Sequence, residues 1–166
     1  MTEATQTWAV PQDDAPNPYV IVTADHQIHI HFWRHARIGA LTVDGDCVLG
    51  HEASGVVLKL GHGLEDLQPD AFVPESTLNR DRVAVEPGVP CGHCHCFRCV
   101  DGHYNLYPDV AFAGVYPSHG TIQRYKVHRA NHVHKLPDKV TLEQAALLEP
   151  VAVALHALCT APVQVG

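Results

Sequence analysis

Hydrophobic and polar residues follow one another in short runs along most of the chain, which is typical of β-strands. Residues 19–23 (YVIVT) form a run of β-branched and aromatic side chains. Ile28, Ile30 and Phe32 then alternate with other residues, as one face of a half-buried strand does. Together these patterns predict strands at residues 19–23, 28–33, 55–60, 82–86, 120–127 and 132–136, the last after a turn near Asn131.

Helical patterns are found only near the end of the chain. Thr141 and Gln144 fit a capping box, in which each side chain satisfies a free backbone N–H at the start of a helix. Pro150 interrupts the helix that follows and suits the first turn of a second one, predicted through Val151–Leu158. We therefore expect a mainly β fold with a helical C-terminal edge, an α+β class.

Two segments fit no regular element. Residues 1–18 are rich in proline and aspartate and are expected to form an irregular N-terminal arm. Residues 70–80 (DAFVPESTLNR) form a polar loop that is long for a connection between two strands, and we interpret it as an insertion.

Composition narrows the class of protein. With 166 residues, 46% of them hydrophobic and 17% charged, the chain has enough apolar material for one domain with a core. The 11 Lys and Arg against 18 Asp and Glu give a net charge of −7 and argue against binding to nucleic acid or an anionic membrane. The start lacks a secretory signal, and no apolar run approaches the roughly 20 residues of a membrane span. We therefore expect a cytoplasmic protein with neither nucleic acid nor membrane as a partner.

Four of the six cysteines form two neighbouring C-x-x-C pairs, Cys91 with Cys94 and Cys96 with Cys99. Two residues between cysteines allow both thiolates to face one ion, and a tetrahedral zinc takes four such ligands. Other ligands within reach in the sequence are His93, His95 and His103. A set of free thiols on a loop and a redox dithiol remain as alternatives, although the βαβ pattern that usually accompanies the redox motif is missing.

Several motifs occur in a fixed order along the chain. They are residues 31–33 (HFW), 49–52 (LGHE), 54–57 (SGVV), 81–88 (DRVAVEPG), the cysteine cluster, 104–106 (YNL) and 148–150 (LEP). This combination resembles the catalytic domain of zinc-dependent medium-chain alcohol dehydrogenases, most closely their polyol branch of sorbitol, xylitol and L-arabinitol dehydrogenases. The resemblance implies a chaperonin-10-like (GroES-like) β-barrel at residues 19–166 with a structural-zinc lobe at 90–108. The NAD-binding Rossmann domain that follows in that family is absent from this sequence.

The resemblance also assigns residues to a catalytic site. His51 matches the family's zinc-binding histidine, and Glu52 matches the acid beside it. Glu149 matches the glutamate that lies at the catalytic zinc or on its water. Phe32 and Phe112 match aromatic positions that line the polyol pocket.

At the first ligand of the catalytic zinc the sequence departs from the family. Where the family has a Cys-Gly-Ser-Asp stretch, this chain has His26-Gln-Ile-His29, so the thiolate is missing. His26 either replaces it through an imidazole nitrogen or is an ordinary strand or loop residue. The aspartate that supports the ligand in the family is replaced by His29.

The structural-zinc segment departs as well. Cys99 matches one of the family's structural-zinc cysteines, with Cys96 as the preceding one, but the place of the last cysteine is taken by Tyr107. Because the cluster is two residues longer than in the family, Cys91, Cys94, Cys96 and Cys99 could close the zinc shell by themselves.

The resemblance implies the catalytic portion of a zinc-dependent, NAD-linked polyol dehydrogenase, which oxidises a secondary hydroxyl of a small-molecule polyol to a ketose. Zn²⁺ is the expected cofactor, and NAD is expected only where a Rossmann domain is supplied, because no Gly-rich dinucleotide motif follows a strand in this chain. The chain by itself is therefore expected to be inactive, and oligomerisation through the missing domain is not expected. The alternatives are a zinc-binding structural or interaction module and a non-functional fragment.

Overall fold

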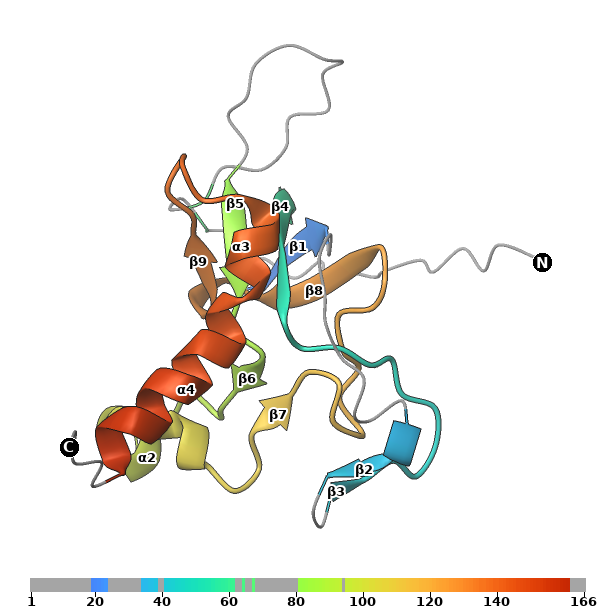
Figure 1. Cartoon of the computed structure of the whole chain (residues 1–166), viewed down its shortest axis with the longest axis vertical. Helices are drawn as coiled ribbons and strands as arrows, with labels where there is room; N and C mark the ends of the chain where they lie inside the picture. The colour runs from blue at the N-terminus through green and yellow to red at the C-terminus, as the bar shows by residue number, and fades with distance from the viewer. Residues whose placement is uncertain are drawn as a thin grey trace, which may run out of the picture.

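The computed structural model describes residues 19–23, 34–38, 41–61, 64, 67, 81–93 and 95–161. Its largest element is a five-stranded sheet in the order β8-β1-β4-β5-β9, with all neighbouring strands antiparallel (Figure 1). The strands are β8 (Tyr125–Arg129), β1 (Tyr19–Thr23), β4 (Ala53–Leu60), β5 (Arg82–Val85) and β9 (Val133–Lys135). The sheet therefore joins segments from the start, the middle and the later part of the chain.

A small valine core holds the sheet together. Val22, Val57 and Val83 are fully buried, and Val85 and Val133 are nearly so. Val22 lies opposite Val57, and Val85 lies opposite Val133. Each buried valine contributes roughly 1.5 kcal/mol or more through the hydrophobic effect. A slip of one residue would turn these side chains to the other face, so the core also fixes the register.

Shorter elements surround this sheet. The pairs β2 (Arg37–Ile38) with β3 (Leu41–Thr42) and β6 (Gly88–Val89) with β7 (Ala111–Phe112) form two-stranded sheets. A short helix α2 (Phe97–Val100) and a 3₁₀ turn η1 (Tyr104–Leu106) lie between β6 and β7, and η2 (Ala130–His132) leads into β9. Of these elements only η2 was predicted, as the turn near Asn131. The others have two to four residues, which are too few to show a periodic pattern.

Glu86 joins the segment between β6 and β7 to the main sheet. The Tyr104 hydroxyl donates a hydrogen bond of 2.7 Å to Glu86 Oε1, and His134 Nε2 lies 2.9 Å from Glu86 Oε2. The hydrogen bond to this carboxylate, together with burial, raises the pKa of Tyr104 to about 12. Tyr104 therefore stays protonated and keeps its hydroxyl as a donor to Glu86.

The two predicted C-terminal helices are present as α3 (Leu142–Ala146) and α4 (Leu148–Thr160). The capping box is confirmed: Gln144 N donates to Thr141 Oγ1 at 3.2 Å, and Thr141 N donates to Gln144 Oε1 at 3.0 Å. Pro150 lies in the first turn of α4, where its missing N–H leaves no helical bond unmade.

Two side chains of the sheet anchor α3. The fully buried Ser54 donates from Oγ to the Leu142 carbonyl at 2.7 Å. The Arg82 guanidinium donates to the carbonyls of Val140, Pro137 and Asp138 at 2.6, 3.1 and 3.0 Å. These bonds fix the position of α3 and of the α4 start directly after it.

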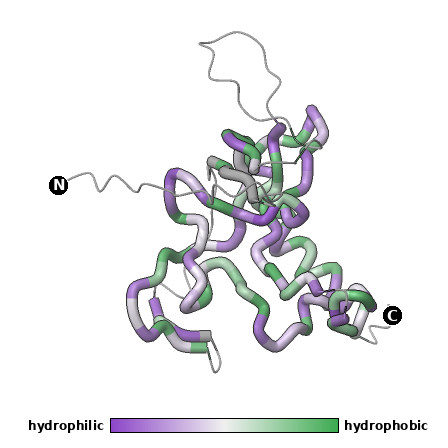
Figure 2. Tube along the Cα trace, turned by 180° about the vertical axis from the view of Figure 1, so that it is seen from behind, coloured by the Kyte–Doolittle hydropathy of each residue, from purple (hydrophilic) through white to green (hydrophobic). Residues whose placement is uncertain are grey.

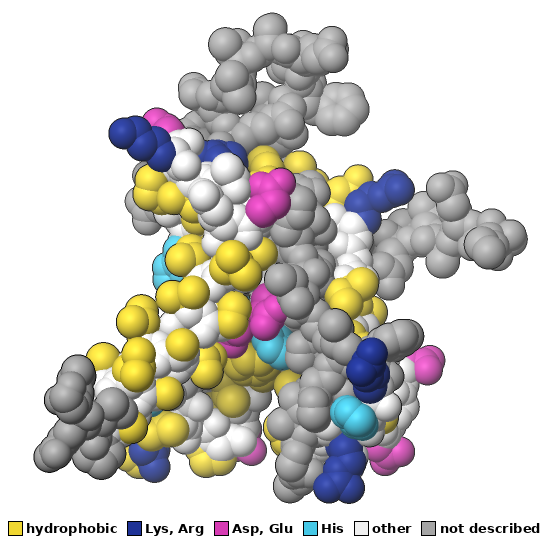
Figure 3. All heavy atoms as spheres, viewed as in Figure 1, with side chains coloured by type: hydrophobic (Ala, Val, Ile, Leu, Met, Phe, Trp, Pro, Cys, Tyr) yellow, Lys and Arg dark blue, Asp and Glu magenta, His cyan; other side chains and the backbone are white. Residues whose placement is uncertain are grey.

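Helix α4 lies on the surface although its sequence is mostly apolar. Val151, Val153, Leu155 and Leu158 are 48 to 61% exposed. The helix trace is mainly white to green in Figure 2, and hydrophobic side chains run along it in Figure 3. A helix that is hydrophobic around most of its circumference is normally covered by protein. None of the described helices has both the length and the hydrophobicity that a membrane crossing needs.

Most of the predicted strands that fall on described residues are confirmed. Those at 19–23, 55–60, 82–86 and 132–136 match β1, β4, β5 and β9, with ends that differ by up to two residues. The strand predicted at 120–127 is wrong in its first half, since β8 begins at Tyr125. Residues 120–122 instead donate their backbone N–H groups to the carbonyls of residues 48–50. The expected arm at 1–18, strand at 28–33 and loop at 70–80 lie outside the described residues.

His128 of β8 is a buried titratable group in this sheet. It is 5% exposed, and its Nε2 lies 2.8 Å from the Glu86 carbonyl oxygen, to which the neutral ring donates. Burial lowers the pKa of His128 to about 4, and the hydrogen bond offsets only part of that effect.

We expect the free energy of unfolding to decrease as the pH falls from about 6.5 to about 4. The unfolded chain protonates His128 near the ordinary pKa of histidine and the folded chain only near 4, so unfolding takes up a proton in this window. The full effect is about 3 kcal/mol. Urea unfolding followed by circular dichroism at several pH values measures it. His128→Gln, which keeps a donor for the carbonyl, should flatten the slope, and His156→Gln on the exposed face of α4 should not. An unchanged slope in His128→Gln would contradict this assignment.

Candidate metal centres

Three metal-binding side chains from distant parts of the sequence meet beside the main sheet. His51 and Glu52 directly precede β4, and Glu149 lies in the first turn of α4. One ligand atom from each of the three lies within 4.8 Å of the others, and all three residues are half-buried. We refer to His51, Glu52 and Glu149 as the His-Glu cluster.

The backbone before His51 is held by a second segment at very short range. Thr121 N and Ile122 N donate to the carbonyls of Gly50 and Leu49, both at 2.9 Å. A Cβ on Gly120 would lie 2.3 Å from each of these two carbonyl oxygens, and a Cβ on Gly114 would lie 2.9 Å from Gly50 N and O. Gly114 and Gly120 therefore permit a backbone approach that no other residue type allows. This approach fixes the turn from which the His51 side chain projects.

The two carboxylates of the cluster lie in an environment that disfavours their charge. Burial raises the pKa of Glu52. Burial and the neighbouring charge of Glu52 raise the pKa of Glu149. Two half-buried carboxylates side by side repel one another, and a divalent cation between them removes that repulsion.

An aromatic ring borders the cluster. The Phe112 ring lies edge-on to the His51 ring with centroids 5.2 Å apart and an interplanar angle of 71°. Figure 3 shows acidic and histidine side chains near the centre of the visible face, beside the hydrophobic side chains of α4. The metal-binding atoms thus have an apolar border, which strengthens electrostatic interactions at the site.

The donors of the His-Glu cluster fit zinc. Imidazole nitrogen and carboxylate oxygen are both zinc ligands, and catalytic zinc sites take three protein ligands and keep one position open. The role of His51, Glu52 and Glu149 as zinc ligands remains a prediction, and so does the role of Phe112 in the polyol pocket.

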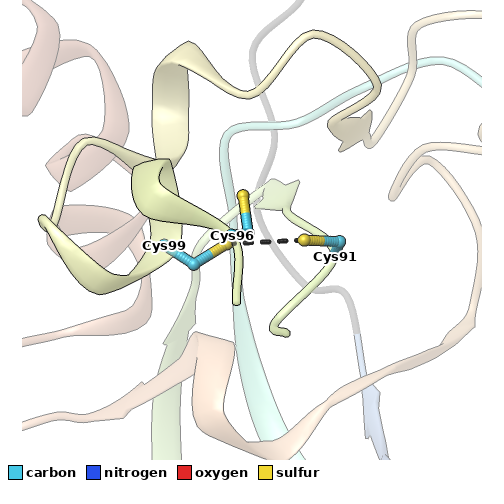
Figure 4. Close-up of side chains that lie close together, drawn as sticks. All are labelled: Cys91, Cys96 and Cys99. Carbon is cyan, nitrogen blue, oxygen red and sulfur yellow. Dashed lines mark hydrogen bonds between the residues drawn. The ribbon is translucent and has the colours of Figure 1, made fainter. Parts of the chain in front are cut away.

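The second cluster consists of three cysteines, Cys91, Cys96 and Cys99, which we call the thiol cluster. Their sulfur atoms lie within 4.8 Å of one another, and the Sγ atoms of Cys91 and Cys99 are 3.6 Å apart (Figure 4). Cys91 follows β6, Cys96 caps the start of α2 and Cys99 lies within α2. A hydrogen bond from the Cys99 backbone lowers the pKa of Cys96, whereas burial raises the pKa of Cys99.

Tyr107 lies at the thiol cluster. Its phenol interacts with Cys91, and burial together with that thiol raises the pKa of Tyr107. The tyrosine that stands in place of the family's last cysteine thus lies beside the three thiols. Among the described residues, no histidine joins the three sulfur atoms, although His93, His95 and His103 were alternatives. His103 Nδ1 instead lies 3.0 Å from Asp101 Oδ2.

Three thiols at this spacing fit one soft or borderline ion such as zinc, for which Zn–S distances are about 2.3 Å. Three further predicted site residues, His26, Phe32 and Cys94, lie outside the described residues. The prediction that His26 binds the catalytic zinc and that Cys94 completes the structural-zinc shell is therefore not tested.

The importance of Gly114 and Gly120 was not recognised in the sequence. Gly120 was read as the first residue of a strand, where a glycine is a weak signal for a close backbone approach. Only the three-dimensional contact with Leu49 and Gly50 reveals its role.

The comparison with known families agrees with this architecture. Residues 20–138 match the alcohol dehydrogenase GroES-like domain, which is most of the chain. The chain belongs to this family. Its relatives include sorbitol dehydrogenases and D-xylulose reductases.

The chain is 41% identical over 156 residues to sorbitol dehydrogenase of Gallus gallus, covering 91% of this chain and 41% of the relative. It is 40% identical over 137 residues to a probable D-xylulose reductase A of Aspergillus fumigatus, covering 82% and 35%. Among solved structures, it resembles an Escherichia coli alcohol dehydrogenase in complex with NADH, with a TM-score of 0.69, 28% identity and coverage of 90% and 40%. The chain spans about two fifths of the length of these relatives.

We expect Gly114→Ala to weaken metal binding at the His-Glu cluster by at least about tenfold, because the new methyl group displaces the Gly50 backbone and with it His51. Gly102→Ala is the matched control. Gly102 shares the positive φ of Gly114 (78° against 76°), but a Cβ there meets nothing within 4 Å.

The control should therefore lose about 1 kcal/mol of stability and keep its metal affinity. Zinc affinity by competition with a chromogenic chelator and stability by urea unfolding separate the two effects. Equal metal affinities for Gly114→Ala and Gly102→Ala would show that the turn at Gly50 does not position His51.

Proposed function

We propose that this chain is the catalytic domain of a zinc-dependent, NAD-linked polyol dehydrogenase, which converts a secondary hydroxyl of a sugar alcohol to a ketone. The observation that carries the proposal is the meeting of His51, Glu52 and Glu149 beside Phe112. The similarity to sorbitol dehydrogenase and D-xylulose reductase supports the substrate class.

In this proposal the residues of the chain bind the metal ion, orient the substrate and accept a proton from it. Zinc at the His-Glu cluster supplies Lewis-acid chemistry that lowers the pKa of a substrate hydroxyl. His51, with its ring set by Phe112, holds the cluster at the turn before β4. Glu149, which lies beside the other atoms of the His-Glu cluster, accepts the hydroxyl proton on a carboxylate oxygen. NAD, held by another domain, would supply the acceptor for the carbon-bound hydrogen, which is removed as hydride.

In this proposal the nicotinamide is bound by a domain other than residues 1–166. The exposed apolar face of α4 begins at the turn that carries Glu149, so a nucleotide-binding domain that covers this face would border the His-Glu cluster. Such a domain would both exclude water from the cluster and place NAD against the substrate. The chain alone would hold metal and lack a hydride acceptor.

The second candidate function is a zinc-binding structural or interaction module. The thiol cluster favours it, because its three ligands all lie within one short segment and need no other part of the fold. In that case the thiol cluster would be the only centre that holds metal.

Metal content separates these functions. We expect two zinc ions per chain after mild chelation, measured by mass spectrometry under non-denaturing conditions. His51→Ala and Glu149→Gln should each remove one ion, and Cys91→Ser should remove the other. Glu143→Gln, an exposed glutamate in the first turn of α3, is the matched control for Glu149→Gln and should keep both. One ion that depends only on Cys91 would favour the module.

We expect polyol-dependent NADH formation only when a nucleotide-binding domain is present. Joined to the remaining part of the chicken sorbitol dehydrogenase chain, residues 1–166 should oxidise a sugar alcohol, and His51→Ala should abolish the reaction. The absorbance of NADH with sorbitol and xylitol as substrates measures the rate. Rapid NADH formation by the 166-residue chain alone would contradict the proposal that NAD is bound by a separate domain.

A further inference from the structure

A cavity of about 670 Å³ is lined by residues of β6, β7 and β8 and by none of the three residues of the His-Glu cluster. Ala111 and Ala113 line the cavity, whereas Phe112 between them contacts His51. The cavity is therefore separate from the proposed catalytic site, and the inference below does not depend on the proposed function.

Two basic side chains of β8, Lys126 and Arg129, line this cavity. Lys126 Nζ donates to the His119 carbonyl, and no other residue in the described part of the chain accepts a hydrogen bond from it. The Arg129 guanidinium lies against Gly92, where a Cβ would be 2.9 Å from Nη1. Within the described part of the chain, neither cation forms an ion pair with a carboxylate.

This arrangement has an electrostatic cost. Burial lowers the pKa of Lys126, so its charge is held in a site that disfavours it. The described lining residues include one carboxylate, that of the exposed Asp109, against the two cations. In a chain with a net charge of −7, a concave region with a positive excess concentrates anions.

The rest of the cavity suits an organic molecule. Val89, Pro90 and Ala111 give it an apolar wall, and its volume falls in the range of about 300 to 1,000 Å³ that is usual for small-molecule sites. His119 and Gln123 add polar groups on the loop before β8.

We propose that this cavity binds a small organic oxyanion, a phosphate ester or a carboxylate, whose charged group binds to the basic side chains of its lining, Lys126 and Arg129. Arginine suits such a group because its planar guanidinium donates two parallel hydrogen bonds, and lysine adds a point charge. The apolar wall holds the organic part of the ligand.

Calorimetry with the zinc-loaded chain of 166 residues tests the proposal. The probes are inorganic phosphate, citrate, and a hexitol with its phosphate ester as a matched pair. We expect the hexitol phosphate to bind more tightly than the hexitol, and its affinity to fall as salt is added. Oxyanion binding that Lys126→Gln and Arg129→Gln weaken supports the site, and the comparison of phosphates with citrate identifies which oxyanion it prefers.

Lys126→Gln and Arg129→Gln should each weaken oxyanion binding by about tenfold or more, the usual size of one charged hydrogen bond. Arg124→Gln is the control, because Arg124 is exposed beside β8 and does not line the cavity. Circular dichroism confirms that each variant is folded. If one cavity variant fails to fold, the other still tests the proposal. The proposal is overturned if none of the oxyanions binds, if neither cavity variant weakens their binding, or if Arg124→Gln weakens binding as much as the cavity variants.

Discussion

The candidate catalytic site depends on the close approach of two backbone segments at Gly50. Residues 48–50 accept hydrogen bonds from residues 120–122, and Gly114 and Gly120 leave the space that this contact needs. His51 and Glu52 follow directly, so their direction is set by main-chain geometry and little freedom remains for the side chains. Glu149 is brought to the same place by a different route. Ser54 and Arg82 bind the backbone before and at the start of α3, and α4 begins directly after α3. A metal ion at the His-Glu cluster would thus join two parts of the fold that are each already fixed.

Helix α4 connects the His-Glu cluster to any protein domain that covers the exposed apolar face of the helix. Its first turn carries Glu149, while Val153, Leu155 and Leu158 farther along are more than half exposed. Covering these side chains would stabilise the helix and would remove water from the neighbourhood of Glu149 at the same time. Binding of a second domain and the ionisation of Glu149 would therefore be coupled through one element. This coupling gives a physical reason why a dehydrogenase of this family would place its metal at the boundary between two domains.

Sequence patterns were sufficient to predict an element where it is long enough to show a hydrophobic period or where it carries a specific cap. Strands β1, β4 and β5 and the capping box of α3 belong to this group. The two-residue strands could not be predicted, because they arise from tertiary pairing. The residues alone made Gly50-His51-Glu52 a weak motif, and it was the ordered set of motifs that selected His51 and Glu149. The positions of Tyr107 beside Cys91 and of Lys126 and Arg129 around one cavity required the structure, since alternation along β8 does not show which face is hollow.

The two metal clusters differ in how much of the fold they need, and this difference decides what a bound metal would mean. The thiol cluster draws its ligands from residues 91–99, so it can form once the short turn around α2 is in place. The His-Glu cluster needs β4, the glycine contacts at Gly50 and the anchored helices together. Partial unfolding that detaches α4 would therefore destroy the second cluster and leave the first. Total zinc content is for this reason a weak measure of catalytic competence. An ion whose binding depends on both His51 and Glu149 shows that the turn before β4 and the start of α4 have come into contact.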